Sequence, residues 1–177
     1  MDAPAPSFDR LSVVAFAPGW IVEDMRKIRA RCAKSGVPVM DAHVTVKGGL
    51  VVPADLGALK AKIARAVHGY PPFTVRTMDP QVLERGGKAD VILPLEDSPQ
   101  LVRLHDLLSV LGGESRPYQP HVTVVEQISL DGVERTVRAI VGWRVNYFWT
   151  IRDVDLVGLE RGQLWRSIKR FDFGKPV

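Results

Sequence analysis

The string His43-Val44-Thr45-Val46 occurs a second time in this chain, as His121-Val122-Thr123-Val124. β-Branched residues dominate both copies, and polar and apolar side chains alternate, so each copy is predicted to be a half-buried β-strand. Side chains two residues apart on a strand point to the same face, so each copy places an imidazole and a hydroxyl together on one surface. The valines then point to the opposite face and anchor the strand in the core.

These residue types suit chemistry at a phosphate group. An imidazole accepts or donates a proton near neutral pH, and a threonine hydroxyl donates a hydrogen bond to an anionic oxygen. A single His-x-Thr on a half-buried strand is usually surface decoration, but two matching copies favour a shared site. Two facing pairs would hold a phosphate between an acid and a base. We therefore predict that His43, Thr45, His121 and Thr123 are the catalytic residues.

With these motifs the chain resembles the two-histidine (2H) phosphoesterase superfamily, whose signature is a pair of His-x-Thr/Ser-x motifs, one in each half of a duplicated domain. The superfamily includes 2′-5′ RNA ligases and RNA or nucleotide cyclic phosphodiesterases. The residues before the motifs fit as well, with Asp41-Ala42 before the first and Arg116-Pro117-Tyr118-Gln119-Pro120 before the second. The resemblance extends from Leu11 to Phe173.

Two departures from the family pattern lie beside the motifs. Where the family often continues the first motif with Phe-Leu-Gly, this chain has Lys47-Gly48-Gly49-Leu50, and Glu126 follows the second motif where some members carry a base. Lys47 either reaches a phosphate from a glycine-rich turn or is a solvated side chain beside a plain strand-to-helix turn. Arg116 and Tyr118 are predicted to contact the phosphate and to stack on a base, or else this segment only shapes the strand entry.

The resemblance implies an α+β fold with two lobes, each an antiparallel sheet with helices packed outside, and a central cleft that carries both motifs. Hydrophobic periodicity predicts strands over 11–17, 39–46, 73–78 and 90–95, and further strands within 144–173 that turn at 160–163. It predicts helices over 21–36, 56–69 and 98–111, and a fourth helix that Ser129 or Asp131 caps and that ends at Gly142. The strands 73–78 and 90–95 are expected to form a hairpin whose connection, 79–89, is a binding loop. Residues 1–10 are expected to be a flexible tail and residues 11–177 a single domain.

Composition limits the class of protein. A length of 177 residues with 46% hydrophobic residues suits one globular domain with a sizeable core. A net charge of +4 permits an anionic partner but lacks the strongly basic character of a protein that wraps nucleic acid. The single cysteine excludes an internal disulfide, and no apolar run approaches the roughly 18 residues of a membrane span. With no signal-peptide pattern at its start, the chain is expected to be a cytoplasmic monomer without a membrane partner.

The other residues with reactive side chains have structural explanations. Cys32 lies on the apolar stripe of a predicted helix and is expected to be a small buried hydrophobe. His68 falls in the last turn of a helix, where the dipole favours a partly charged imidazole, and His105 borders a leucine stripe as part of the scaffold. The histidines and the cysteine lack the spacing of a zinc site, so no metal and no cofactor are predicted.

Together with the resemblance, the motifs predict a metal-independent phosphodiesterase that opens 2′,3′-cyclic phosphates on RNA ends or nucleotides. A neutral histidine takes a proton from the attacking water, a protonated one donates to the leaving ribose oxygen, and Thr45 and Thr123 hold the non-bridging oxygens. By resemblance, His43 is the acid, His121 is the base, and O3′ leaves to give a 2′-phosphate. Two alternatives stay open: a reversible 2′-5′ RNA ligase, and a non-catalytic RNA- or nucleotide-binding module on the same fold.

Overall fold

The computed structural model describes residues 8–32, 40–113, 117–141, 143, 145–162 and 164–174. In chain order its elements are β1 (Phe8–Phe16), α1 (Gly19–Arg31), β2 (His43–Leu50), α2 (Leu56–Val67), β3 (Phe73–Arg76), β4 (Gln81–Arg85), β5 (Lys88–Pro94), α3 (Pro99–Leu107), the 3₁₀ helix η1 (Leu108–Leu111), β6 (His121–Ser129), α4 (Leu130–Ile140), β7 (Phe148–Ile151), β8 (Asp153–Glu160) and β9 (Leu164–Asp172). None of the helices in the described part of the chain has the length and apolar character needed to cross a bilayer.

The two motif strands lie side by side at the centre of one antiparallel sheet. This sheet has the order β4-β5-β6-β2-β1-β8-β9, and β3 and β7 form a separate antiparallel pair. Val44 and Val122 are the register pair that joins β2 to β6. The predicted α+β class with antiparallel sheets is confirmed, and both motif strands belong to a single continuous sheet.

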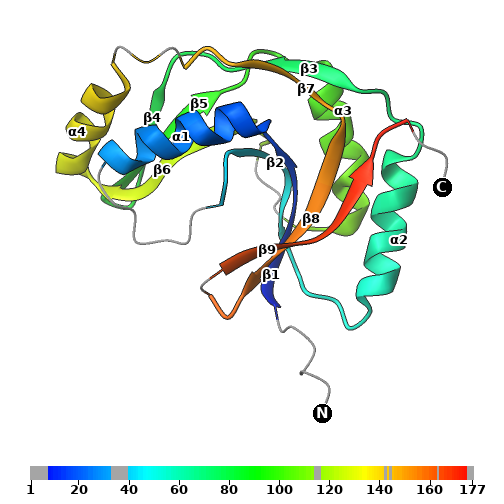
Figure 1. Cartoon of the computed structure of the whole chain (residues 1–177). Helices are drawn as coiled ribbons and strands as arrows, with labels where there is room; N and C mark the ends of the chain where they lie inside the picture. Colours follow the sequence, from blue (N-terminus) through cyan, green and yellow to red (C-terminus); the bar gives the residue numbers. More distant parts are fainter. Residues whose placement is uncertain are drawn as a thin grey trace.

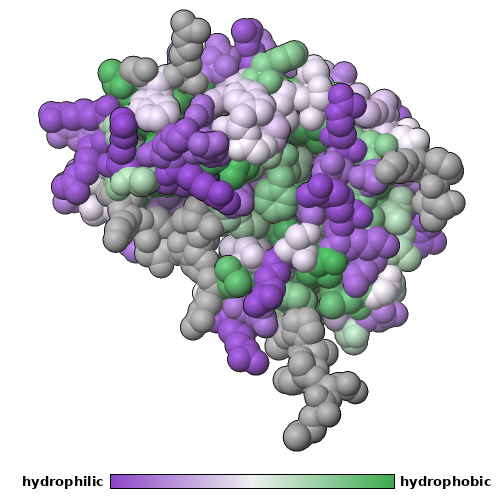
Figure 2. All heavy atoms as spheres, in the orientation of Figure 1, coloured by the Kyte–Doolittle hydropathy of each residue, from purple (hydrophilic) through white to green (hydrophobic). Residues whose placement is uncertain are grey.

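The helices pack on the sheet in two pairs, and each pair contains one helix from each half of the chain (Figure 1). Helices α1 and α4 pack on each other and on β6, whereas α2 and α3 pack on each other, with α3 against β2 and α2 against β9. A helix from the first half of the chain therefore covers the second motif strand, and a helix from the second half covers the first. On the face in Figure 2, hydrophilic side chains gather over α1, whose other side buries Ile21, Met25 and Ile28.

Two of the helices begin with a side-chain cap. Asp55 caps α2 by accepting hydrogen bonds from the backbone N–H groups of Gly57 and Ala58, at 2.7 and 3.0 Å. Ser98 caps α3, which begins with a proline and continues into η1. The first helix was expected to reach Gly36, but α1 ends at Arg31, and residues 33–39 lie outside the described part of the chain.

The predicted hairpin between residues 73–78 and 90–95 is wrong. Strand β3 pairs with β7, which lies far away in the sequence, and β5 pairs with β4 and β6. The two segments meet only at one isolated bridge, between Thr77 and Leu95. The partner of β3 comes from the last third of the chain, so local sequence patterns could not identify it.

The segment 79–89 was expected to be a long binding loop, but most of it is the β4–β5 hairpin. Gly86 and Gly87 have φ values of +56° and +78°. A two-residue turn with positive φ at both central positions matches the twist of the flanking strands and favours glycine. The glycine pair was therefore the signal for a tight hairpin rather than for a long loop.

Two strand boundaries differ from expectation. Strand β1 starts at Phe8, so residues 8–10, expected in the tail, pair with β8 instead. Strand β2 runs from His43 to Leu50 and includes Lys47-Gly48-Gly49, which were expected to form a turn. The β1–β2 register is irregular beside these residues, and Gly49 has a φ of +65°, so the glycines fit a distorted strand.

Candidate active site

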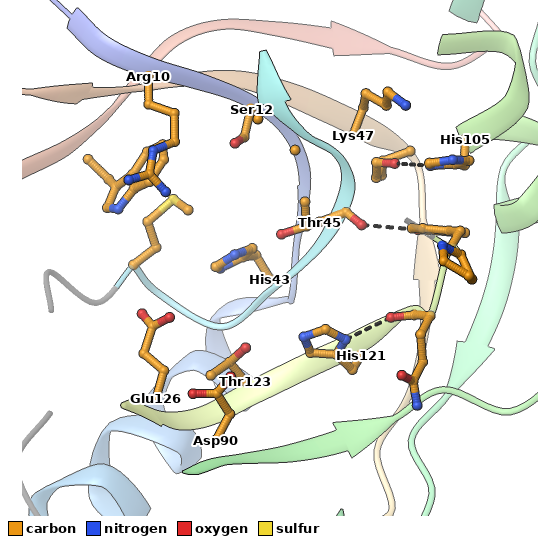
Figure 3. Close-up of a pocket in the computed structure, with 18 of the residues that line it drawn as sticks. Arg10, Ser12, His43, Thr45, Lys47, Asp90, His105, His121, Thr123 and Glu126 are labelled. Atoms are coloured by element: carbon orange, nitrogen blue, oxygen red, sulfur yellow. Dashed lines mark hydrogen bonds between the residues drawn. The ribbon is translucent and has the colours of Figure 1, made fainter. Parts of the chain in front are cut away.

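A pocket of ≈ 330 Å³ lies over the junction of β2 and β6. All four predicted catalytic residues line it, His43 and Thr45 from β2 and His121 and Thr123 from β6 (Figure 3). Lys47 and Tyr118 also line this pocket, and Arg116 lies outside the described residues. Both copies of the repeated motif therefore contribute to one pocket.

The register of the two motif strands explains this convergence. Val44 and Val122 are directly paired and fully buried, so the residues on either side of them point to the opposite face of the sheet. Because the strands are antiparallel, the alternation around this pair sets His43 beside Thr123, and His121 beside Thr45. Each end of the shared face thus receives one imidazole and one hydroxyl.

Both imidazoles are oriented by the same backbone contact. The Nδ1 atom of His43 lies 2.7 Å from the carbonyl oxygen of Asp41, and Nδ1 of His121 lies 2.7 Å from that of Gln119. A carbonyl oxygen only accepts hydrogen bonds, so Nδ1 carries the hydrogen in each ring. The other ring nitrogen, Nε2, is then a base when the ring is neutral and an acid when it is protonated.

The pocket favours the neutral form of both rings. The pKa of His43 falls from 6.5 to about 4, chiefly through loss of hydration, and the charges of Arg29 and the nearby His121 act in the same direction. Burial also lowers the pKa of His121, and the charge of Arg85 adds to this effect. A bound anion would raise both pKa values, because an opposite charge stabilises the imidazolium.

Arg29 of α1 lines the pocket and binds the backbone of the second motif strand. Its Nη2 donates to the carbonyl oxygen of Thr123 at 2.7 Å, its Nε to that of Val124 at 2.9 Å, and its Nη1 to that of Met40 at 2.7 Å. The partly buried guanidinium thereby connects β6 to the segment that leads into His43. This role of Arg29 could not be predicted from the sequence, because nothing in the α1 pattern distinguishes Arg29 from the other basic residues of that helix.

Tyr118 and His105 bind backbone carbonyl oxygens of the first motif strand, as Arg29 does for the second. The Tyr118 hydroxyl donates to the carbonyl oxygen of Thr45 at 3.0 Å, and His105 donates through Nδ1 to that of Val46 at 2.8 Å. Their rings are stacked, with centroids 4.0 Å apart. His105 therefore acts as scaffold, and Tyr118, expected to stack on a base, has one ring face covered by His105.

The pairing irregularities just after the two motifs also correspond. Each motif strand carries one extra residue relative to its outer neighbour, between Thr45 and Lys47 in β2 and between Thr123 and Val125 in β6. Such a bulge reverses the face to which the following side chains point. The fifth residue of each strand, Lys47 or Val125, is buried, and the sixth faces the pocket.

The sixth residue of β6 is Glu126, whose side chain points into the pocket (Figure 3). Strict alternation would have directed Glu126 toward the core and Val125 toward the site, so the sequence pattern alone did not place it there. Lys47 is only 5% exposed, and in Figure 3 its side chain extends away from the space between the two motif histidines.

Further residues complete the pocket without having been predicted. They come from β1, β5 and β9 and include Arg10, Ser12, Asp90 and Trp165, and Arg85 of β4, within the segment predicted to be a binding loop, also lines the pocket. Across the described ranges, no group of three or more His, Cys, Asp or Glu side chains is placed to hold a metal ion.

The fold and the paired motif strands define a protein of the 2H phosphoesterase class, as the motifs predicted. A family model described as 2′-5′ RNA ligase superfamily matches residues 17–163, and the chain belongs to that superfamily. No curated protein sequence matches it.

Solved structures of the same fold cover nearly the whole chain. TT0787 of Thermus thermophilus has 16% identity and a TM-score of 0.71, over 95% of this chain and 100% of that one. LigT of E. coli, solved in complex with 3′-AMP, has 20% identity and a TM-score of 0.68, over 96% and 100% of the two chains. A protein described as a phosphoesterase has 20% identity and a TM-score of 0.66, over 94% and 99%. At these identities the likeness concerns the fold.

Proposed function

We propose that this chain is a phosphodiesterase that opens 2′,3′-cyclic phosphates on RNA ends or nucleotides and releases 2′-phosphates. One observation carries the proposal. His43 and His121 line a single pocket, each with Nδ1 bonded to a carbonyl oxygen two residues earlier, so that both Nε2 atoms are left for proton transfer. The hydroxyl groups of Thr45 and Thr123 belong to the same pocket.

The proposed reaction is an in-line displacement at phosphorus. Nε2 of His121 takes a proton from water as the water oxygen attacks phosphorus, and Nε2 of His43 donates a proton to O3′ as the P–O3′ bond breaks. The threonine hydroxyls donate hydrogen bonds to the non-bridging oxygens, on which negative charge develops. The ring strain of the cyclic ester is released, which favours cyclic over linear diesters as substrates.

The assigned roles require His43 to gain a proton when the substrate binds. The low pKa of His43, about 4, keeps the ring neutral in the free protein at pH 7. The anionic phosphate then favours its protonated form, so the acid receives its proton as the substrate binds. His121, whose pKa is also lowered by burial, supplies the base.

The proposed cleft lies between two lobes, one built on β4-β5-β6 and the other on β2-β1-β8-β9. Their junction is the Val44–Val122 pair. Crystal structures of E. coli LigT contain 3′-AMP, phosphate or ATP, and this supports a nucleotide or a phosphorylated RNA end as the partner of a protein with the same fold.

A panel of cyclic phosphates tests the proposal. Purified protein is incubated with 2′,3′-cyclic AMP, with RNA bearing a 2′,3′-cyclic phosphate, and with linear 3′-5′ RNA, and the products are identified by phosphorus NMR. We expect 2′-phosphates from the first two and no product from the third. A 3′-phosphate product would reverse the assigned geometry.

The same preparation separates the two alternatives. RNA with a 5′-hydroxyl end is added beside the cyclic phosphate RNA, since that hydroxyl can replace water in the reverse reaction. A joined 2′-5′ product would indicate a ligase. Retention of RNA in a filter-binding assay, without turnover of any cyclic phosphate, would indicate a binding module instead.

A further inference from the structure

The two ends of the pocket differ chemically, although the motif strands that build it correspond. The sixth residue of β2 is Gly48, which has no side chain, whereas the sixth residue of β6 is Glu126. Both residues line the pocket, and the Glu126 side chain is partly exposed to it. The repeated architecture therefore brings a carboxylate to one end only.

The Glu126 carboxylate has unused hydrogen-bonding capacity. Within the ranges that the structure describes, no residue donates a hydrogen bond to it or forms an ion pair with it. The neighbouring Arg29 directs its hydrogen bonds to backbone carbonyl oxygens instead. Burial and the nearby Asp90 raise the pKa of the Glu126 carboxyl, while Arg29 and Arg10 oppose this shift. Its oxygens are thus acceptors available to a ligand.

An aromatic ring lies at the same pocket from a different part of the sheet. Leu159 of β8 is directly paired with Arg10 of β1 on one side and with Trp165 of β9 on the other. Directly paired residues point to the same face of a sheet, so the three side chains form a row. Arg10 and Trp165 both line the pocket, and the Trp165 side chain is partly exposed.

We propose that the part of the pocket bounded by Trp165, Arg10 and Glu126 binds the base of a nucleoside 2′,3′-cyclic phosphate, with the base stacked on Trp165 and a base N–H donating to Glu126. This inference rests on the proposed function. Every base offers a face for stacking on an indole ring, and the Watson–Crick edge offers hydrogen bonds to a carboxylate.

The Glu126 carboxylate itself favours a base over a second phosphate. Arg10, Arg29 and Arg85 also line the pocket, but a phosphate placed directly against the carboxylate of Glu126, beside Asp90, would be repelled by it. A neutral base is not repelled, and its N–H groups can donate hydrogen bonds to the carboxylate oxygens. Guanine carries two adjacent donors, N1–H and N2–H, which match the two oxygens of a carboxylate, so we expect it to be the preferred base.

The first experiment removes the stacking surface. Trp165→Ala should raise the KM for the four nucleoside 2′,3′-cyclic phosphates by about 5- to 100-fold, the usual effect of losing one base–aromatic stack. The KM for glycerol 1,2-cyclic phosphate, which has no base, should stay within about twofold of the original. Trp165→Phe keeps an aromatic ring and should restore most of the loss. Trp20→Ala is the matched control, since Trp20 is 55% exposed and does not line the pocket.

The second experiment tests the acceptor. The unmodified protein should have a KM for 2′,3′-cyclic GMP at least about fivefold below that for 2′,3′-cyclic UMP, and Glu126→Gln should abolish this difference because an amide offers only one acceptor oxygen. An equal rise in KM for substrates with and without a base would overturn the subsite. So would an unchanged preference for guanine in Glu126→Gln.

A binding measurement keeps the subsite separate from the catalytic proposal. The affinity of 2′-GMP for the full chain and for Trp165→Ala is measured by calorimetry, which needs no turnover. If no cyclic phosphate is hydrolysed but Trp165→Ala still weakens 2′-GMP binding by about fivefold or more, the catalytic proposal fails and the base subsite stands. If cyclic phosphates are hydrolysed and Trp165→Ala binds 2′-GMP as tightly as the original chain, the subsite fails alone.

Discussion

Val44 of β2 lies directly opposite Val122 of β6, and this register pair joins the two motif strands. Because the strands are antiparallel, a local two-fold axis through this pair relates them, and each histidine has the threonine of the other motif as its neighbour. In both motifs, backbone carbonyl oxygens accept hydrogen bonds from side chains. Arg29 donates to carbonyl oxygens of β6, and Tyr118 and His105 donate to those of β2. The repeated four-residue string therefore places one imidazole and one hydroxyl at each end of the face that the two strands share.

Removal of either motif imidazole should disable turnover. His43→Ala and His121→Ala should each lower kcat for 2′,3′-cyclic AMP by about 10²–10⁴-fold, because each removes one acid–base group. His68→Ala is the control, since His68 is exposed at the end of α2. A loss below about tenfold in both motif variants would contradict the acid–base roles.

The motif threonines should contribute less than the histidines. Thr45→Val and Thr123→Val retain the shape of the side chain but each lose one donor to the developing charge, so kcat should fall by about 10- to 10³-fold. Thr74→Val, at an exposed position of β3 outside the pocket, provides the matched control. Steady-state kinetics test this role of the threonines, because loss of transition-state stabilisation lowers kcat and leaves KM nearly unchanged.

Chelation should leave activity intact. Across the described ranges no cluster of three or more potential ligands could hold a metal ion, and the proposed proton transfers use His43 and His121 alone. Initial rates are compared before and after dialysis against excess EDTA. Loss of activity that returns on adding a divalent metal would require a different mechanism.

The sequence predicted the site better than it predicted the sheet. The two His-x-Thr motifs each show a strand pattern, and the family resemblance implies that the two strands meet, so the sequence predicted that His43, Thr45, His121 and Thr123 lie around one pocket, as they do. The β3–β7 pair could not be found in this way, because the pairing of β3 is set by contacts between segments that are distant in the chain.

The missed pocket residues have a common physical reason. Glu126 faces the site only because the irregular pairing of β6 shifts its alternation, and a strict period of two predicts the opposite face. Trp165 reaches the pocket through the register of β9 on β8 and of β8 on β1. Neither bulge positions nor register across several strands can be determined from local composition.

The depressed pKa of His43 should make the fold sensitive to acid. In the unfolded chain His43 takes up a proton near pH 6.5, but in the folded protein only near pH 4. Between these values the unfolded state binds more protons, so stability present above pH 6.5 is lost as the pH falls toward 4. The free energy of unfolding is measured by urea denaturation at about pH 7 and at about pH 4.5. The decrease between the two pH values should be about 2 kcal/mol smaller in His43→Gln than in the original protein. Equal losses in the two proteins would mean that His43 is not held neutral.

Arg29 should affect both the stability of the site and the protonation of His43, and two variants separate these effects. Arg29→Met removes the donors to the carbonyl oxygens of Thr123, Val124 and Met40, at about 1–3 kcal/mol for each buried acceptor left unpaired. It also removes the positive charge that lowers the pKa of His43.

Arg29→Lys retains that charge, but a lysine ammonium lacks the planar fork that reaches three acceptors. Both variants should therefore unfold at lower urea concentration, whereas only Arg29→Met should raise the pKa of His43 in an NMR titration of the imidazole. A purely structural role for Arg29 would give the same His43 pKa in both variants. If that pKa rises in Arg29→Met alone, the guanidinium helps to keep His43 neutral until an anionic substrate arrives, in addition to holding the second motif strand in place.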